Sequence, residues 1–373
     1  MTIDEFRATF AVEPGYLNWA AFGPLSTTVI DDVRVDADLY VSGRQSGIDL
    51  LNEHAGEAQD MLSQLLDVPL AWMTHQATTT HGLQQAIYGI RSGAVMASTG
   101  EWPSITVGIT RAADAMGRIT PQFITPPDNM MTPDAIADAL TPETTAVVVS
   151  LVDFRTGYRT DLGAIRDVIG DDRLLIVDAV QGFGVVQADY AAADVVTGSG
   201  YKWLRAGRGA GWASFSDEAR SRLDPVLSNV AGIAGGLVLD SVGKPAETAA
   251  AFQTSMPDYL ACARLVSGLQ DVISVGVDTI EAEVGRRTAE VIAIADRFDI
   301  DVVTPRGAAQ RGGIVALAPR NDGAAMLGAS LTNGGLATTT RSGSVRIAVH
   351  AGTDDETMRM FEDAVAAYAQ HAH

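Results

Sequence analysis

The sequence is very poor in cysteine and lysine. Its 373 residues contain one cysteine, Cys262, which excludes an internal disulfide framework and a zinc or iron–sulfur site built from cysteines. Lysine occurs only at Lys202 and Lys244, so arginine carries almost all of the positive charge. Low cysteine usage is typical of proteins in a reducing compartment, and we expect a cytoplasmic protein.

Long apolar runs and an excess of basic charge are also absent. No run approaches the roughly 18 apolar residues that span a bilayer, and the start, MTIDEFRATF, does not have the pattern of a secretory signal. The formal net charge is −20, with the acidic residues spread along the chain. We therefore expect neither nucleic acid nor an anionic membrane surface as a partner.

The middle of the chain alternates short apolar runs with helical patterns. The runs are GAVMAST from residue 93, AVVVSLV from residue 146, LLIVDAV from residue 174 and ADVVTGS from residue 193. Helical patterns cover residues 103–117, 133–140 and 161–170. This alternation predicts an α/β fold with a mainly parallel sheet that is covered on both faces.

The two ends of the chain follow a different pattern. Residues 27–66 have the periodicity of two amphipathic helices. After residue 257 come helical patterns, the runs GGIVALA and GSVRIAV, and a final helix from about Asp354, which is α+β ordering. We predict a large domain over residues 16–245 and a smaller α+β domain formed by residues 1–15 and 246–373.

Lys202 stands in the unusual setting TGSGYKWL, directly after an apolar run. Ligands of open α/β sheets bind at the carboxyl ends of strands, where a lysine amine can form a Schiff base with an aldehyde cofactor. The alternative is a solvated surface lysine. The flanking small and aromatic residues, and the use of arginine elsewhere, argue against that alternative.

Asp178 ends the run LLIVD, where a buried carboxylate needs a partner. A protonated pyridine nitrogen is one such partner, and capping of the following turn is an equally good explanation of Asp178 taken alone. Together, VDAVQGFG and SGYKWL resemble the class V aminotransferase group of pyridoxal 5′-phosphate (PLP) enzymes. That group includes cysteine desulfurases, isopenicillin N epimerase and kynureninase, and the resemblance implies PLP and the fold type I of these enzymes.

The resemblance implies specific roles for residues around the lysine. Lys202 would form the Schiff base with PLP, Asp178 would hold the pyridine nitrogen, and Gln181 would bind the ring hydroxyl. Ser199 and Tyr201 would contact the phosphate.

The stretch THQATTTHGLQQAI supplies further candidates for phosphate binding. Hydroxyls and free backbone N–H groups meet where Thr78, Thr79 and Thr80 precede a helical pattern. The alternative for any one of these threonines is a plain helix N-cap.

STGEWPSI resembles the family's segment that covers the cofactor ring. Trp102 would stack on the ring, although a core tryptophan is the competing interpretation. Phe154 stands where the desulfurases have an asparagine, which is typical of a kynureninase-like branch.

A substrate carboxylate fits the planar fork of arginine. In RSGSVRIAVHAGTDDE, Arg346 matches the family's carboxylate-binding arginine, and Arg341 is a second candidate, for a distal acidic group. Asn18 and Phe22, in YLNWAAFGPLS, are expected to line the substrate pocket.

The expected reaction is inferred from the range of reactions in the family that the sequence resembles. Residues 332–345 contain no cysteine, so we expect an enzyme that is not a cysteine desulfurase. An aminotransferase acting on a small-molecule amino acid is the first prediction; a kynureninase-like or C–S lyase, an epimerase and a non-catalytic binding protein are the alternatives. We expect a homodimer with the site at the interface, although Ser255 and Met256 replace the family's Gly-Thr pair, and we expect no bound metal.

Overall fold

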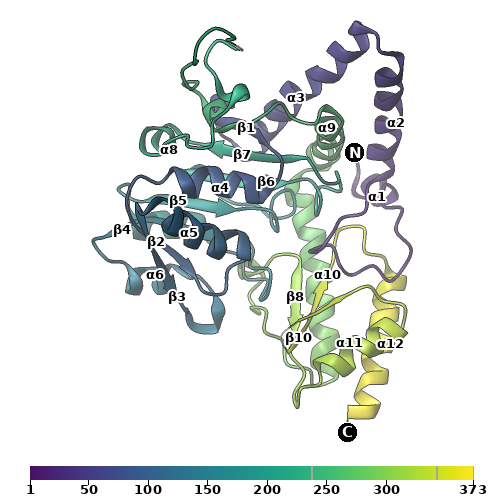
Figure 1. Ribbon diagram of the computed structural model, residues 1–373. Coiled ribbons are helices and arrows are strands. Elements are labelled where there is room, and N and C mark those ends of the chain that lie inside the picture. Colours follow the sequence, from purple (N-terminus) through teal and green to yellow (C-terminus); the bar gives the residue numbers. More distant parts are fainter. Residues whose placement is uncertain (237, 342, 373) are drawn as a thin grey trace.

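The computed structural model describes residues 1–236, 238–341 and 343–372, and contains two sheets (Figure 1). The larger sheet has the strand order β1-β7-β6-β5-β4-β2-β3. Strand β7 runs antiparallel to both of its neighbours, and the other adjacent pairs are parallel. The strands are β1 Met73–Gln76, β2 Gly93–Ser98, β3 Ile119–Ile124, β4 Thr144–Ser150, β5 Leu174–Asp178, β6 Val195–Ser199 and β7 Gly211–Phe215.

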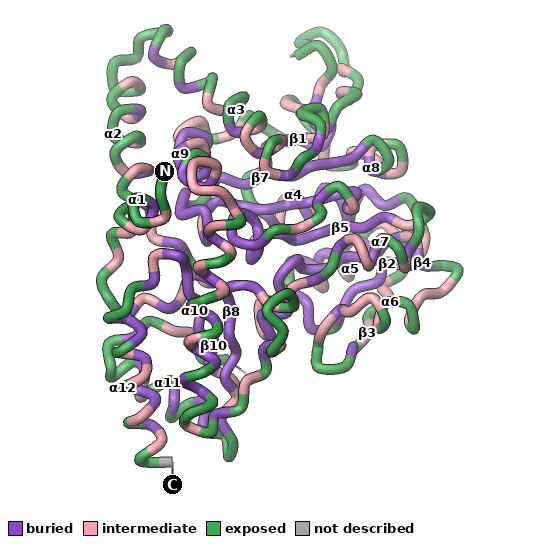
Figure 2. Tube along the Cα trace, turned by 180° about the vertical axis from the view of Figure 1, so that it is seen from behind, coloured by how far each residue is buried: buried purple, intermediate pink, exposed green. Residues whose placement is uncertain are grey.

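Successive residues of the central strands enter two different apolar cores, because side chains alternate across a sheet. Val147 and Val149 of β4 lie in one core, and Ala146 and Val148 lie in the other. Both faces are therefore buried, as a mainly parallel sheet requires, and Figure 2 shows these strands mostly as buried. One face carries α4 Thr79–Gly89, α5 Pro103–Met116 and α8 Asp217–Arg222, and the other carries α3 Gln45–Leu66, α6 Pro133–Ala139, α7 Leu162–Ile169 and α9 Tyr259–Val275. The predicted α/β fold is confirmed.

The smaller sheet is antiparallel, in the order β8-β10-β9. Val345 and Ile347 of β10 face its helices, so the alternation turns Arg346 to the opposite face. The smaller sheet and its helices consist of β8 Ile314–Leu317, β9 Thr339–Arg341, β10 Ser344–Ala348, α10 Val277–Arg297, α11 Ala324–Asn333 and α12 Asp355–Ala372. The domain boundary at residue 245 stays a prediction.

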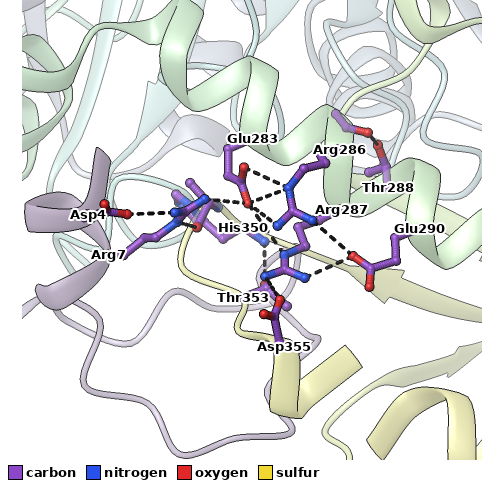
Figure 3. Close-up of polar contacts among 12 residues, drawn as sticks. Asp4, Arg7, Glu283, Arg286, Arg287, Thr288, Glu290, His350, Thr353 and Asp355 are labelled. Carbon is purple, nitrogen blue, oxygen red and sulfur yellow. Dashed lines mark hydrogen bonds and ion pairs between the residues drawn. The ribbon is translucent and has the colours of Figure 1, made fainter. Parts of the chain in front are cut away.

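The N-terminal segment is attached to the smaller sheet and its helices. Helix α1, Ile3–Ala8, carries Arg7, which forms an ion pair with Glu283 of α10 at 2.8 Å (Figure 3). Arg287 of α10 in turn pairs with Asp355 of α12 at 2.7 Å. Further along, isolated β-bridges join Tyr16 to Ala337 and Asn18 to Ala348. The N-terminal segment therefore lies against α10 and the smaller sheet, whereas the C-terminal end of α12 lies far from the N-terminus (Figure 1).

Helix α2, Thr27–Ser42, packs with α3 and α9, as the amphipathic patterns predicted. The helical region after residue 257 contains two helices, because Gly276 adopts φ +90° between α9 and α10. Within the described ranges, no single helix combines the length and apolarity of a membrane span; α9 and α10, bent by 84°, satisfy both only as a pair.

Candidate active site

The predicted cofactor residues meet at one edge of the larger sheet. Asp178 ends β5, Ser199 ends β6, and Thr78 caps helix α4 just after β1. These three strands run in the same direction, so their carboxyl ends lie along a common edge. This is the edge where open α/β sheets bind their ligands.

Lys202 lies on the loop between β6 and β7 and is only 8% exposed. Its Nζ atom is 5.3 Å from the centre of the Tyr201 ring. Burial lowers the pKa of Lys202 to about 8, against the opposing effect of Asp178 and with a further lowering by Arg346 and Arg341. The surface-lysine alternative is therefore wrong: the amine is buried and is easily deprotonated.

Asp178 is 3% exposed, and burial raises the pKa of its carboxyl. One oxygen, Oδ1, accepts a hydrogen bond from the backbone N–H of Val180 at 3.0 Å. The carboxylate therefore does cap the following turn, which was the competing explanation. It also lies close enough to Lys202 for the two charges to influence each other.

Gln181 links the lysine loop to the N-terminal segment. Its Nε2 donates to the carbonyl of Ala20 at 2.9 Å, and its Oε1 accepts from the Trp203 indole at 3.0 Å. Both ends of the amide are thus bonded within the protein, and the expected contact with the cofactor hydroxyl stays a prediction.

The N-terminal segment passes directly over the lysine loop at Gly23. The Gly23 N–H donates to the carbonyl of Tyr201 at 2.8 Å, and a Cβ at Gly23 would lie 1.7 Å from the Lys202 carbonyl oxygen. Only glycine fits this approach. The glycine of FGPLS is therefore explained by the contact of the backbone at Gly23 with the backbone of the lysine loop.

The three threonines differ in their surroundings. Thr78 caps α4 by accepting from the His81 N–H at 3.1 Å, and Thr80 shares a 2.6 Å hydrogen bond with Ser104. The buried Oγ1 of Thr79 has no hydrogen-bond partner among the described residues. The plain-cap interpretation thus holds for Thr78, while Thr79 retains an unused hydroxyl.

A cavity of about 620 Å³ opens beside Trp102. Trp102 is 39% exposed and packs edge-on against Phe154, with ring centres 5.0 Å apart, so it is not a core tryptophan. Arg346, 6% exposed, donates to the Phe154 carbonyl at 3.2 Å. Burial lowers the pKa of Arg346 to about 10, with a further contribution from the nearby Arg341.

Asn18 and Phe22 are placed by the N-terminal segment. The Oδ1 of Asn18 accepts from the Thr339 hydroxyl at 2.8 Å, beside the smaller sheet. Phe22 is 39% exposed, and its carbonyl accepts from the Tyr16 hydroxyl at 2.8 Å. Their contact with a substrate stays a prediction.

The sequence analysis missed Glu101 and Arg155, which also line the cavity. The Glu101 oxygens accept from Ser150, from its N–H at 3.0 Å and its hydroxyl at 2.5 Å. Burial raises the pKa of Glu101 to about 7. The sequence pattern could have identified Glu101 as a site residue, since it directly precedes Trp102 in STGEWPSI and follows the end of a buried strand.

Comparison with known proteins assigns a family to this site. A family model for aminotransferase class-V matches residues 57–359. A kynureninase from Deinococcus radiodurans is 27% identical over 191 residues, which cover 49% of this chain and 47% of the relative. The match therefore spans less than half of that relative's length.

Solved structures match nearly the whole chain. Cysteine desulfurase from Thermococcus onnurineus NA1 has a TM-score of 0.87 at 16% identity, covering 100% of this chain and 99% of its own. The cystine C–S lyase C-DES has a TM-score of 0.85 at 18% identity, covering 96% and 98%. The desulfurase CsdA from Escherichia coli has a TM-score of 0.82 at 16% identity, covering 100% and 99%. The fold is that of fold type I PLP enzymes.

The prediction of an aminotransferase-like enzyme that is not a cysteine desulfurase is wrong. Solved structures that share this fold over nearly their whole length include cysteine desulfurases and a C–S lyase. The prediction rested on the lack of a cysteine in residues 332–345. One side chain on a loop contributes little to the packing that defines a fold, so it does not separate the chain from these proteins.

PLP is the cofactor of this family, and the site residues fit it. A variant of C-DES has glycine covalently linked to its PLP cofactor. Here, the buried amine of Lys202 suits an aldehyde, and the buried carboxylate of Asp178 suits a pyridinium. The unpartnered hydroxyl of Thr79, at the start of helix α4, suits a phosphate.

Proposed function

The chain belongs to the class V aminotransferase family of PLP-dependent enzymes, and from this premise we propose that it is a lyase that releases the β-substituent of an α-amino acid. The main support is the environment of Lys202. Its amine is buried, and burial lowers its pKa to about 8, close to the pH at which a general base works best.

Three groups of this chain would hold the cofactor. Lys202 would bind its aldehyde carbon, Asp178 its ring nitrogen and Thr79 its phosphate. When bound, PLP withdraws electrons from the substrate's Cα and makes the Cα proton acidic.

Arg346 would orient the substrate. Its guanidinium is buried, and its Nε has no hydrogen-bond partner among the described residues, so it retains a donor for a carboxylate. Arg346 lies close enough to Lys202 for its charge to lower the lysine pKa, so a carboxylate bound by Arg346 would bring the substrate near Lys202. The Lys202 amine, freed when the substrate's amine takes its place on the cofactor, would then take the Cα proton.

The cavity of about 620 Å³ beside Trp102 gives the β-substituent room to leave. For a sulfur substituent, the Cβ–S bond breaks and the sulfur departs with its electron pair. It gains a proton to become a thiol. The rest of the substrate and one water become pyruvate and ammonium, so the reaction needs no external oxidant or reductant.

Cleavage of a Cβ–C bond, as in kynureninase, is the second candidate. The aromatic pair Trp102 and Phe154 supports it, because an aryl group attached to the substituent can stack in this cavity. The match to the Deinococcus radiodurans kynureninase favours the same reaction.

We also propose that the protein acts as a homodimer in the cytoplasm. The segment before α9 exposes several large apolar side chains, which suits an interface: Val226, Val230, Leu239, Val242 and Met256. Sedimentation of the purified protein with PLP tests the dimer, and a monomer would overturn it.

The cofactor and the reaction are tested on the protein purified with PLP. Borohydride reduction should fix PLP to Lys202, as located by peptide mass spectrometry, and K202A should retain no covalent PLP. K244A is the matched control, because it removes the only other lysine, which is exposed. An amino acid with a sulfur substituent on Cβ should yield pyruvate and a thiol. A protein that takes up no PLP would contradict the proposal.

A further inference from the structure

Three arginines line the cavity beside Trp102, and the hydrogen-bond partners of their guanidinium groups among the described residues are neutral. Arg346 donates to the Phe154 carbonyl, and Arg155 donates to the Asn129 side chain at 3.4 Å. Within the described ranges, neither these two nor Arg341 forms an ion pair with a carboxylate. The chain has 46 acidic residues against 26 basic ones, so this local excess of positive charge is unusual for the molecule.

The only carboxylate among the described cavity-lining residues does not neutralise these arginines. Glu101 directs its two oxygens to the N–H and the hydroxyl of Ser150. Burial and the nearby Asp153 and Asp178 hold its pKa at about 7, so part of the Glu101 population is uncharged at neutral pH. Asp153 partly offsets the charge of Arg346 and opposes the effect of burial on its pKa, but none of the three guanidinium groups forms an ion pair among the described residues, so each can still bind an anionic ligand.

The arginines occupy different depths of the cavity. Arg346 is buried on β10, whereas Arg341 at the end of β9 is exposed. Arg341 lies over the Trp102 ring at 5.6 Å, and Arg155 lies beside the Phe154 ring at 5.8 Å. The aromatic pair therefore has a guanidinium next to each of its rings.

The guanidinium of Arg155 packs against the backbone at Gly100. A Cβ at Gly100 would lie 1.4 Å from Arg155 Nη2, so in this conformation the guanidinium occupies the space beside Gly100. Its buried Nε has no hydrogen-bond partner among the described residues. Guanidinium groups of like charge are costly together unless an anion lies between them.

We propose that the substrate carries two anionic groups: its α-carboxylate, bound by Arg346, and a second at the end of its side chain, bound by Arg341 and Arg155. The middle of the side chain lies along Trp102 and Phe154. This inference rests on the proposed function, because it assigns a substrate class to the same site. A β-substituent that ends in a carboxylate satisfies it.

Two pairs of compounds test the proposal on the holoenzyme. Glutarate and butyrate differ by one carboxylate, and calorimetry should show glutarate binding roughly 10-fold or more tightly, since hydrogen bonds to charged groups are strong. S-carboxymethylcysteine has a carboxylate where S-ethylcysteine has a methyl group, and the first should have the higher kcat/KM for pyruvate release.

Both preferences should disappear in R341Q and in R155Q. R341Q changes an exposed side chain, so its folding is not at risk, and circular dichroism checks both variants. R111Q is the matched control, because Arg111 lies on the surface of α5 and pairs with Asp114. Equal binding of glutarate and butyrate, or a preference retained in R341Q and R155Q, would overturn the inference. If PLP binds and S-ethylcysteine reacts as well as its carboxylated counterpart, the proposed function stands and only the second anion site fails.

Discussion

Lys202 combines a charged group with an environment that disfavours charge. In the protein without cofactor, replacing it by methionine should raise the free energy of unfolding at neutral pH by up to about 3 kcal/mol. The folded pKa of about 8 lies below the ordinary 10.5, so the unfolded chain binds more protons between these values and wild-type stability rises with pH there.

Urea unfolding of wild type and K202M from neutral pH to above pH 10.5 measures this effect. The advantage of K202M should shrink across the window between the two pKa values. An advantage that is constant with pH would show that the methionine acts through packing alone.

The contribution of Glu101 to stability changes with pH in the opposite direction to that of Lys202. Burial raises its pKa from 4.5 to about 7, so the folded state binds more protons in that window and stability falls as the pH rises through it. E101Q cannot titrate, so its unfolding free energy should vary less with pH between 4.5 and about 7. The measurement is urea unfolding at several pH values within the window. Parallel curves for E101Q and wild type would contradict the prediction.

At the scale of elements, a buried arginine fastens α1 and α9 to the lysine loop. Arg205 adopts φ +55°, and its guanidinium lies 3.9 Å from the centre of the Phe10 ring. It donates to the Thr9 hydroxyl at 2.8 Å and pairs with Asp271 of α9 at 3.2 Å. Both members of this ion pair are almost fully buried.

D271A should therefore destabilise the protein by about 3 to 5 kcal/mol, because it leaves a buried charge without a partner. D31A is the control: Asp31 pairs with Arg34 on the surface, where such a pair contributes at most about 1 kcal/mol. Chemical unfolding measures both variants. Similar losses of stability in the two variants would show that the buried ion pair between Arg205 and Asp271 contributes no more than a surface pair.

The sequence predicted the long elements well and the short strands poorly. The apolar runs that became β2, β4, β5 and β6 are buried on both faces and carry a clear signal. Strand β1 has the sequence MTHQ, which contains no apolar pattern that would predict a strand. These residues form a strand because they pair with β7, which is distant in the sequence. The order of the strands depends on contacts between distant segments, which local periodicity does not encode.

The same division applies to the site. The burial of Lys202, Asp178 and Arg346 could be predicted, because each is a charged residue in or directly after an apolar run. Arg155 could not, because its place depends on the space left at Gly100, more than 50 residues earlier in the chain.

At the scale of the whole molecule, the single thiol reports on global unfolding. Cys262 is 3% exposed in α9, and burial raises its pKa to about 12. A thiol reagent should modify the native protein at least roughly 1,000-fold more slowly than the unfolded chain, because access requires opening of the core. Absorbance of the released chromophore with and without denaturant measures the ratio. Rapid modification of Cys262 with an unchanged circular dichroism spectrum would contradict the prediction that the thiol is reached only after unfolding.

During synthesis, the segment that covers the lysine loop leaves the ribosome long before the strands that hold it. Residues 16 and 18 pair with residues 337 and 348, which are made much later in the chain. Arg346 is made equally late. Until residue 348 has been made, the segment that covers the lysine loop lacks at least one of its two pairing partners, so the site is complete only after that point of synthesis.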